Sequence, residues 1–281
     1  MPIQQMFLGL GAAKEMVRYI WGSNEHPYSG MLGQNQGPAQ SDGYSSPVQL
    51  TAGNVPWVGH SAHGQGVSAM VREDGTYWTW GRQTHGQLGQ NQATNTAISS
   101  PAQVPGTTWS STYNKMSGDG SAYTFANIKT DGTLWMWGRC SEGQCGTGDT
   151  NDRSSPIQIP GTNWVHVRNN YSRTHAIKSD GTLWSWGING NGNLGHNNKT
   201  TYSSPKQVTG TTWNTIRTCN YATLGIKNDG TLWSWGANYA GKLGHNDDNK
   251  RSSPVQVGSA TGWQADTLSI GQDVSSATLE E

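Results

Sequence analysis

Residues 229–236 read Asp-Gly-Thr-Leu-Trp-Ser-Trp-Gly, and this stretch decides the fold class. Asp-Gly between two runs of alternating apolar residues predicts a tight hairpin, because its turn requires positive backbone φ angles. Trp233 and Trp235 follow the turn two residues apart, so they lie on the same face of a strand. Gly236 removes a side chain where a neighbouring backbone comes close. The stretch therefore predicts a β-hairpin with one Trp-bearing face.

The same stretch recurs along the chain and identifies a tandem repeat. Each copy has a Trp-Gly anchor, then Gly-x-Leu-Gly (Gly-Gln-Cys-Gly at 143–146 in one copy), then Ser-Ser-Pro-x-Gln, and finally a lone Trp. The structural anchors are Trp21, Gly22, Trp80, Gly81, Trp137, Gly138, Trp186, Gly187, Trp235 and Gly236. All 14 Trp residues fall within this frame, so their placement is explained by the scaffold.

Each copy reads as four short strands, expected at 213–218, 222–227, 231–235 and 254–257 in the most regular copy. One four-stranded sheet cannot bury its Trp residues alone, whereas sheets stacked radially bury a continuous core. Gly-rich turns and a repeat of this length fit that arrangement. The sequence predicts an all-β fold, a β-propeller of four-stranded blades.

The two ends of the chain suggest how the propeller closes. Residues 17–21 read as a third strand with no first strand before it, and residues 263–281 supply a first and second strand. We expect these pieces to complete one shared blade, giving five blades closed by the N- and C-terminal strands, with six as the alternative. Residues 1–16 form an N-terminal arm or an extra strand, and residues 17–281 form a single propeller domain.

Charge and hydropathy exclude several classes of partner. The formal net charge is zero, only 13% of residues are charged, and there is no Lys/Arg run, so we expect no nucleic-acid partner. No apolar run approaches the roughly 20 residues of a membrane-spanning helix, so we expect no membrane insertion. Residues 6–13 lack the basic start of a signal peptide, which predicts synthesis in the cytoplasm.

Candidate catalytic and cofactor motifs are explained by the repeat. Residues 236–242 have the spacing of a phosphate-binding loop, but Leu243 stands where Ser or Thr would hold Mg²⁺. His196 and His245 occupy a repeat position that is Gln90 in another copy. Gln can replace His as a hydrogen-bonding residue but not as a general base. We expect no catalytic residues, no cofactor and no enzymatic activity.

The three cysteines allow two interpretations. Cys140 and Cys145 are close enough in sequence for a metal or redox pair. An odd, small number of cysteines argues against a disulfide framework, and no second ligand pair accompanies them. Cys145 stands where other copies have Leu, which favours a small core residue. We expect no metal site.

The repeat resembles that of the regulator of chromosome condensation family, from residue 17 onward. Its Trp-rich, charge-poor form is similar to bacterial and phage members. The resemblance implies a β-propeller that contacts proteins through its end faces. Members of that family usually have seven blades, whereas this chain has five copies of the repeat. The founding member is an exchange factor for a small GTPase, but the basic tail associated with chromatin binding has no counterpart here.

Insertions in the first half of the chain predict where binding takes place, because loops on a rigid scaffold commonly carry function. The candidate binding-loop residues are Glu25, Tyr28, Asn35, Tyr44, Asn95, Tyr113 and Tyr123. The predicted function is a non-enzymatic structural or protein-interaction module, as a phage virion component such as a fibre, tail or head decoration. The alternatives are a lectin-like propeller that binds glycans and a cytoplasmic protein-binding regulator. The expected partner is a protein or a second copy of the chain.

Overall fold

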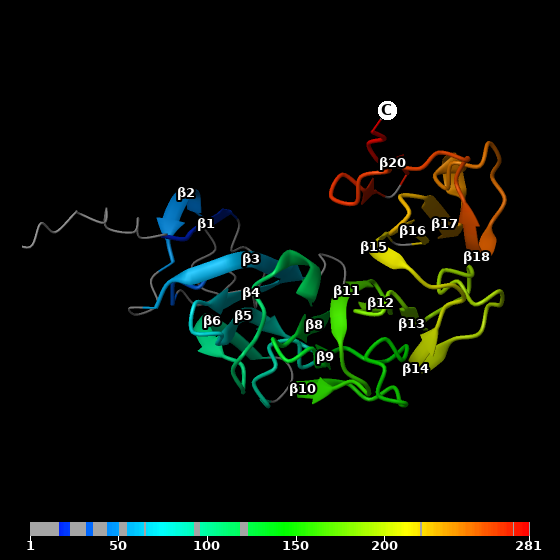
Figure 1. Cartoon of the computed structure of the whole chain (residues 1–281). Coiled ribbons are helices and arrows are strands. Elements are labelled where there is room, and N and C mark those ends of the chain that lie inside the picture. The colour runs from blue at the N-terminus through cyan, green and yellow to red at the C-terminus, as the bar shows by residue number, and fades with distance from the viewer. Residues whose placement is uncertain are drawn as a thin grey trace, which may run out of the picture.

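A computed structural model of the chain describes residues 17–22, 32–35, 44–50, 55–64, 66–92, 96–118, 123–219, 221–271 and 273–280. These residues form four antiparallel four-stranded sheets and two two-stranded sheets, arranged one after another along an arc (Figure 1). The predicted all-β propeller architecture of four-stranded blades is confirmed. No helix in the described part of the chain is long and apolar enough to span a membrane.

The complete sheets follow one plan, in which consecutive strands pair with each other. The first contains β3 (Trp57–Gly64), β4 (Val67–Arg72), β5 (Tyr77–Gln83) and β6 (Thr96–Gln103). The second contains β7 (Met116–Ser117), β8 (Thr124–Ile128), β9 (Leu134–Gly138) and β10 (Arg153–Gln158), preceded by the short helix η1 (Tyr113–Lys115). The third contains β11 (Trp164–Asn170), β12 (Arg173–Lys178), β13 (Leu183–Gly187) and β14 (Tyr202–Gln207). The fourth contains β15 (Trp213–Thr218), β16 (Ala222–Lys227), β17 (Leu232–Gly236) and β18 (Arg251–Gln256), with the short helix η2 (Tyr239–Gly241) after β17.

The strands of the fourth sheet test the sequence-based boundaries directly. The strands predicted at 213–218 and 222–227 are confirmed as β15 and β16, and β17 lies one residue later than expected. β18 begins at Arg251 rather than at Pro254. The reason is a register shift in β17, where Ser234 pairs with Val255 but Gly236 pairs with Arg251. This irregularity brings the Ser-Ser-Pro segment into the edge strand.

The ends of the arc correct the expected closure. β1 (Tyr19–Gly22) pairs with β2 (Tyr44–Gln49), while β19 (Ser269–Ile270) pairs with β20 (Ser275–Ser276). These are two separate two-stranded sheets in the described part of the chain, and they do not join into one blade. Figure 1 places them at opposite ends of an open arc. Curvature depends on how each sheet packs on the next, and at the curvature observed these sheets do not complete a circle.

The Trp anchors form the core between consecutive sheets. Trp80, Trp137, Trp186 and Trp235 are fully buried. The indole Nε1 of Trp186 donates a hydrogen bond to the carbonyl oxygen of Gln144 in the preceding sheet at 2.8 Å. Equivalent bonds join Trp137 to Gln87 at 3.0 Å and Trp235 to Asn193 at 2.8 Å. Each of these three anchors therefore fills the space between two sheets and hydrogen-bonds the loop of its neighbour.

Glycine is required in the loop that receives the Trp and also directly after each Trp anchor. A Cβ atom on Gly146, in the loop that receives Trp186, would lie 2.7 Å from the indole nitrogen. Gly138, in the Trp-Gly anchor of the second sheet, has a φ of 98°, and a Cβ there would lie 2.1 Å from the carbonyl oxygen of Tyr123. Both glycines let backbone and ring approach more closely than any other residue would allow. Trp21 and Gly22 lie in β1.

Candidate functional site

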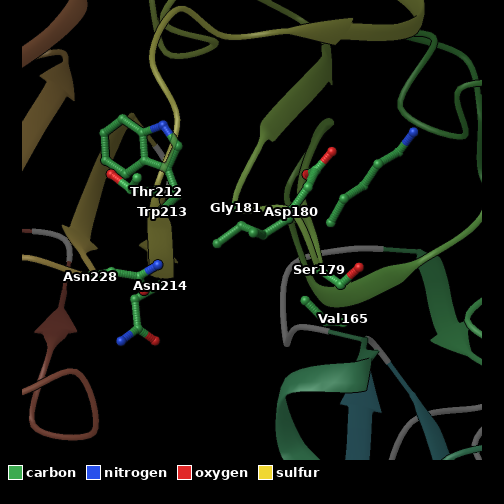
Figure 2. Close-up of a pocket in the computed structure, with 10 residues that line it drawn as sticks. Val165, Ser179, Asp180, Gly181, Thr212, Trp213, Asn214 and Asn228 are labelled. Atoms are coloured by element: carbon green, nitrogen blue, oxygen red, sulfur yellow. The ribbon is translucent and has the colours of Figure 1, made fainter.

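A cleft of about 270 Å³ opens between the third and fourth sheets. Figure 2 shows Asp180 and Gly181, from the turn between β12 and β13, facing Thr212, Asn214 and Asn228 of the next sheet. A backbone hydrogen bond joins the two sheets here, from Trp213 N to Gly181 O at 2.9 Å, and Asn228 N donates to Thr212 O at 2.7 Å within the fourth sheet. The cleft thus lies where a hairpin turn of one sheet meets the first strand of the next.

The carboxylate in this cleft has a structural role. Asp180 Oδ1 accepts hydrogen bonds from the backbone N of Thr182 at 2.9 Å and from its hydroxyl at 2.7 Å. The same hydroxyl accepts from Trp184 Nε1 at 3.0 Å. The bond from the Thr182 hydroxyl, followed by that from its backbone, lowers the pKa of the Asp180 carboxyl. A carboxylate held in its ionised form by these bonds is a poor general base.

This Asp-Thr-Trp chain recurs in every complete sheet. The equivalent hydrogen-bonded chains in the other three complete sheets begin at Asp74, Asp131 and Asp229. In each case the bond from the Thr hydroxyl is the main reason why the pKa of the carboxyl is lowered. A feature present in every copy belongs to the scaffold, so the cleft carries no chemistry that distinguishes it from the other sheet junctions.

A cation lies between two Trp rings next to each of these turns. The ammonium of Lys178 is 4.8 Å from the ring centroid of Trp164 and 4.7 Å from that of Trp184. Arg72, Lys129 and Lys227 occupy the same place in the other complete sheets. Cation–π contacts of this kind contribute about 0.5–2 kcal/mol each. A sugar would stack on the face of an aromatic ring. In these sheets a Lys or Arg side chain already covers the faces of the two Trp rings.

In the third and fourth sheets, an Asn side chain holds the loop after the third strand by hydrogen bonds to its backbone, at the end of the sheet opposite to the Asp-Gly turn; we call this side chain the clip. Asn189 Oδ1 accepts from the backbone N of Leu194 at 2.9 Å, and its Nδ2 donates to Asn198 O at 3.0 Å. Asn238 makes the equivalent bond to Leu243 N at 2.8 Å. The clipped loop of the third sheet presents the carbonyl oxygen that accepts the hydrogen bond from the Trp of the next sheet.

In the second sheet the clip is covalent. Cys140 and Cys145 form a disulfide, and both residues are fully buried. The prediction of a small core residue at Cys145 is right about burial but wrong about its chemistry, since the odd number of cysteines left room for one bonded pair. Cys219 is a free, buried thiol. Within the described ranges, no group of three or more His, Cys, Asp or Glu side chains could hold a metal ion.

The two repeat histidines hold the same loop to its sheet. His196 Nε2 lies 2.9 Å from the hydroxyl of Ser185, and His245 Nε2 lies 2.8 Å from that of Ser234. In the first complete sheet Gln90 Nε2 donates to the hydroxyl of Thr79 at 3.1 Å. Both Ser hydroxyls also donate to a loop carbonyl and are buried. The Ser-His pairs therefore occupy the place of a Thr-Gln pair and have its structural role.

Lys242 lies where the apparent phosphate-binding loop would place its lysine. Its side chain is buried, and its ammonium lies 3.9 Å from the sulfur of Cys219. Leu243 beside it packs with Cys219 and Ala222 in the core. This lysine points into the protein rather than toward an open phosphate site.

The predicted binding residues that the structure describes lie in different parts of the fold. Glu25, Tyr28 and Asn95 lie outside the described residues, as does the arm at 1–16. Asn35 has a φ of 56° and donates its backbone N–H to Ser99 O at 2.9 Å, and Tyr44 lies in β2. Tyr123 packs edge-on against His85 with ring centroids 5.1 Å apart. Tyr113 lies in η1 and is 48% exposed.

Sequence reasoning missed three exposed tyrosines in the second half of the chain. Tyr171 and Tyr221 lie between the first and second strands of the third and fourth sheets, and Tyr239 lies in η2. They are 51%, 39% and 49% exposed. Tyr221 and Tyr239 contact each other edge to face with centroids 6.1 Å apart. The available signal was the dipeptide Asn-Tyr, which occurs at 170–171, 220–221 and 238–239.

The fold and these junctions define a tandem-repeat β-propeller, and comparison with known proteins identifies its family. The regulator of chromosome condensation (RCC1) repeat matches residues 74–111, 131–168, 180–219 and 229–277. This covers more than half of the chain, which therefore belongs to the RCC1 repeat family. The expected resemblance is confirmed at the level of the family.

Several known proteins share this repeat. The human E3 ubiquitin-protein ligase HERC2 is 28% identical over 157 residues, which are 54% of this chain and 3% of HERC2. The mitochondrial RCC1 domain-containing protein RUG3 of Arabidopsis thaliana is 27% identical over 141 residues, which are 50% of this chain and 30% of RUG3. The chain thus spans less than a third of the length of these relatives.

Solved structures show the same fold. The crystal structure of Prp20p from Saccharomyces cerevisiae matches with a TM-score of 0.67 and 17% identity, covering 86% of this chain and 59% of Prp20p. Human WBSCR16 matches with a TM-score of 0.66 and 19% identity, covering 82% of this chain and 60% of WBSCR16. The arc in Figure 1 therefore corresponds to part of these longer propeller chains.

Proposed function

We propose that this chain is a non-enzymatic protein-interaction module that binds a protein partner through one end of its sheets. The face consists of Tyr171, Tyr221 and Tyr239, and we call it the tyrosine face. In an up-and-down antiparallel sheet, the turn between strands one and two lies at the same end as the connection between strands three and four. All three residues are in connections of this kind. One end of the third and fourth sheets thus carries three exposed aromatic rings.

The observation that carries the proposal is the contrast between buried Trp and exposed Tyr. The Trp anchors of the four complete sheets are fully buried, whereas these three Tyr side chains are between 39% and 51% exposed. Tyr is enriched at protein interfaces because it offers a large rigid contact surface and a polar hydroxyl at low entropic cost. A rigid β scaffold also places the three rings in advance, which lowers the cost of ordering them on binding.

The relatives support an interaction role. Prp20p of Saccharomyces cerevisiae binds Gsp1p and histones, and those are properties of Prp20p. HERC2 is named an E3 ubiquitin-protein ligase, but this chain matches only 3% of it. The Ser-His pairs and the Asp-Thr-Trp chains are hydrogen-bonded parts of the scaffold. These observations favour an interaction module over an enzyme.

Within this role we propose that the chain is a phage virion component, as a fibre, tail or head decoration. The support is the Trp-rich, charge-poor form of the repeat and the zero formal net charge. Immunogold labelling of purified particles tests this setting. Regular labelling of one part of the particle is expected. Unlabelled particles would contradict the virion setting and leave a cytoplasmic protein-binding regulator as the role.

The tyrosine face itself is tested by photo-crosslinking. A crosslinker placed at Asn191, beside this end of the third sheet, should capture one specific partner in extracts of the producing cells, identified by mass spectrometry. The triple variant Tyr171→Ser, Tyr221→Ser and Tyr239→Ser should lose this product. The control variant Val165→Ser and Val255→Ser also removes exposed apolar side chains, but elsewhere, and should keep it. Equal capture by both variants would contradict the proposed face.

A further inference from the structure

The carbonyl oxygen of Asn193 is a hydrogen-bond acceptor at the junction of the third and fourth sheets. It accepts from Trp235 Nε1 at 2.8 Å and from the Thr223 hydroxyl at 3.3 Å, and both of these donors belong to the fourth sheet. A further bond comes from the third sheet itself, because His175 Nε2 in β12 lies 3.1 Å from the same oxygen. The rings of His175 and Trp235 are 6.3 Å apart between centroids. This histidine therefore lies in the contact that joins the two sheets.

His175 departs from the repeat at its position. It pairs with Ser185, the residue directly before the anchor Trp186. The equivalent positions of the other complete sheets hold buried apolar side chains, namely Ala69, Ala126 and Leu224. The scaffold therefore does not require a histidine here, and a titratable ring distinguishes this junction from the others between complete sheets.

His175 is fully buried and is held in its neutral form. A carbonyl oxygen only accepts hydrogen bonds, so Nε2 carries the proton and Nδ1 does not. Nδ1 is buried without a hydrogen-bond partner in the described part of the chain. Burial, followed by the charge of Arg173 on the same strand, lowers the pKa of His175 to about 3, and His196 acts in the same direction. Protonation would therefore place a charge, and an N–H donor without an acceptor, inside the junction.

A second buried histidine lies at the same junction. His166 in β11 of the third sheet forms a hydrogen bond with the backbone of Asn214 in β15 of the fourth sheet. Burial lowers the pKa of His166 well below its usual value, and the charges of Arg168 in β11 and Arg217 in β15 lower it further. Arg168 also lies opposite His175 in the pairing of β11 with β12. Both histidines are thus neutral in the closed junction and take up a proton more readily when the junction opens, so acid favours the open form.

We propose that His175 and His166 make the junction between the third and fourth sheets an acid-sensitive hinge, which opens when the two rings are protonated. In a repeat protein each unit packs mainly on its neighbours, so one junction can open while the others stay closed. The stability that depends on neutral histidines is fully present above the ordinary His pKa of about 6.5 and is lost as the pH falls toward the lower folded values. The tyrosine face spans this junction, since Tyr171 belongs to the third sheet and Tyr221 to the fourth. An effect of acid on partner binding rests on the proposed function, whereas the hinge itself does not.

The indole N–H groups of three Trp anchors report on three junctions separately. Trp235 donates from the fourth sheet to the third, Trp186 from the third to the second, and Trp137 from the second to the first. Hydrogen exchange of these protons, measured by NMR on protein with ¹⁵N-labelled Trp, gives a protection factor for each junction. Between pH 7.5 and pH 5.5 the protection factor of Trp235 should fall about tenfold or more, because opening lets at least one histidine take up a proton. Those of Trp186 and Trp137 should stay unchanged.

Variants of His175 identify the sensor. His175→Leu introduces the residue type that the fourth sheet has in this position and should reduce the acid-induced fall at Trp235 about tenfold. His175→Gln keeps an amide donor for the Asn193 carbonyl and should have the same effect if the Leu variant does not fold. The control His85→Gln changes a partly exposed histidine of the first sheet and should behave as wild type does. No fall at Trp235 in wild type, or an equal fall in the His175 variants, would overturn the proposal. An equal fall at all three indoles would show acid unfolding of the whole domain and would overturn it as well.

Discussion

The second sheet holds the loop after its third strand by different chemistry from the third and fourth sheets. In the third and fourth sheets, Asn189 and Asn238 clip the loop with hydrogen bonds to the backbone N of Leu194 and Leu243. In the second sheet, the residues at these two repeat positions are Cys140 and Cys145, and they are joined by a disulfide. The positions are retained while the chemistry changes. We infer that the loop joins one sheet to the next, because its carbonyl oxygen accepts the hydrogen bond from the Trp of the following sheet.

The largest effect is expected on removing the Trp that each loop receives. Trp186 donates a hydrogen bond to the loop closed by the disulfide, and Trp235 donates one to the loop held by Asn189. Both rings are fully buried. Trp186→Ala and Trp235→Ala should each reduce the free energy of unfolding by about 3–5 kcal/mol, because each leaves a large cavity between two sheets. Urea unfolding followed by circular dichroism measures both. A large loss in one variant and almost none in the other would mean that the two loops are not equivalent.

Reduction of the disulfide should have the next largest effect. A cross-link over such a short loop contributes about 2 kcal/mol in the chain-entropy description. Wild-type protein should lose roughly this much stability in dithiothreitol, measured as a shift of the urea midpoint. Trp186 fluorescence should change as well, since the Gln144 carbonyl that accepts its N–H lies in the released loop. An unchanged midpoint would show that the loop holds its shape without the bond.

Breaking the hydrogen-bonded clip should have a smaller effect. Asn189→Ala removes the bonds to Leu194 N and Asn198 O and should cost about 1–2 kcal/mol, because a buried donor loses its acceptor. The loss should be independent of reductant, unlike that of the disulfide. The exposed control Lys199→Ala should leave the urea midpoint unchanged. A loss in Asn189→Ala no greater than in this control would mean that the clip does not stabilise the loop.

The smallest expected effect concerns the opposite end of the sheets. The pKa of Asp180 is lowered by its bonds to Thr182, so its ionised form is favoured in the folded protein. The resulting stability is present above the usual carboxyl pKa of about 4 and is lost as the pH falls through the lower folded value. Asp180→Asn should therefore show a slightly smaller drop in urea midpoint between pH 6 and pH 3. Identical drops in variant and wild type would contradict a stabilising role for this carboxylate.

The sequence predicts the strands well because their signals are local. The alternation of residues 222–227 and the Asp-Gly turn after it are sufficient to place β16 and the start of β17. Closure is not local. It depends on the angle at which whole sheets pack, and a count of repeat copies contains no information on that angle. The expected shared blade is therefore wrong, although the individual strands are largely right.

The candidate sites were harder to predict for a related reason. Binding by the long insertions stays a prediction, whereas the proposed tyrosine face uses exposed Tyr171 and Tyr221 from short turns of regular copies. Their exposure depends on how the turn is oriented, not on its length. His175 and Trp235 approach each other from different sheets, so no local pattern in the sequence relates them. The Cys140–Cys145 bond is visible only once the two positions are seen to face each other across the loop.

The central claim is that these loops join one sheet to the next, and that either a disulfide or an Asn side chain can hold the loop in place. It is tested most directly by transplanting the clip, with the double variant Cys140→Asn and Cys145→Leu measured by urea unfolding in dithiothreitol. The new Asn should bond the backbone N of residue 145, as Asn189 bonds that of Leu194. We predict that the double variant is more stable than reduced wild type and unaffected by reductant. A double variant no more stable than reduced wild type would contradict the claim.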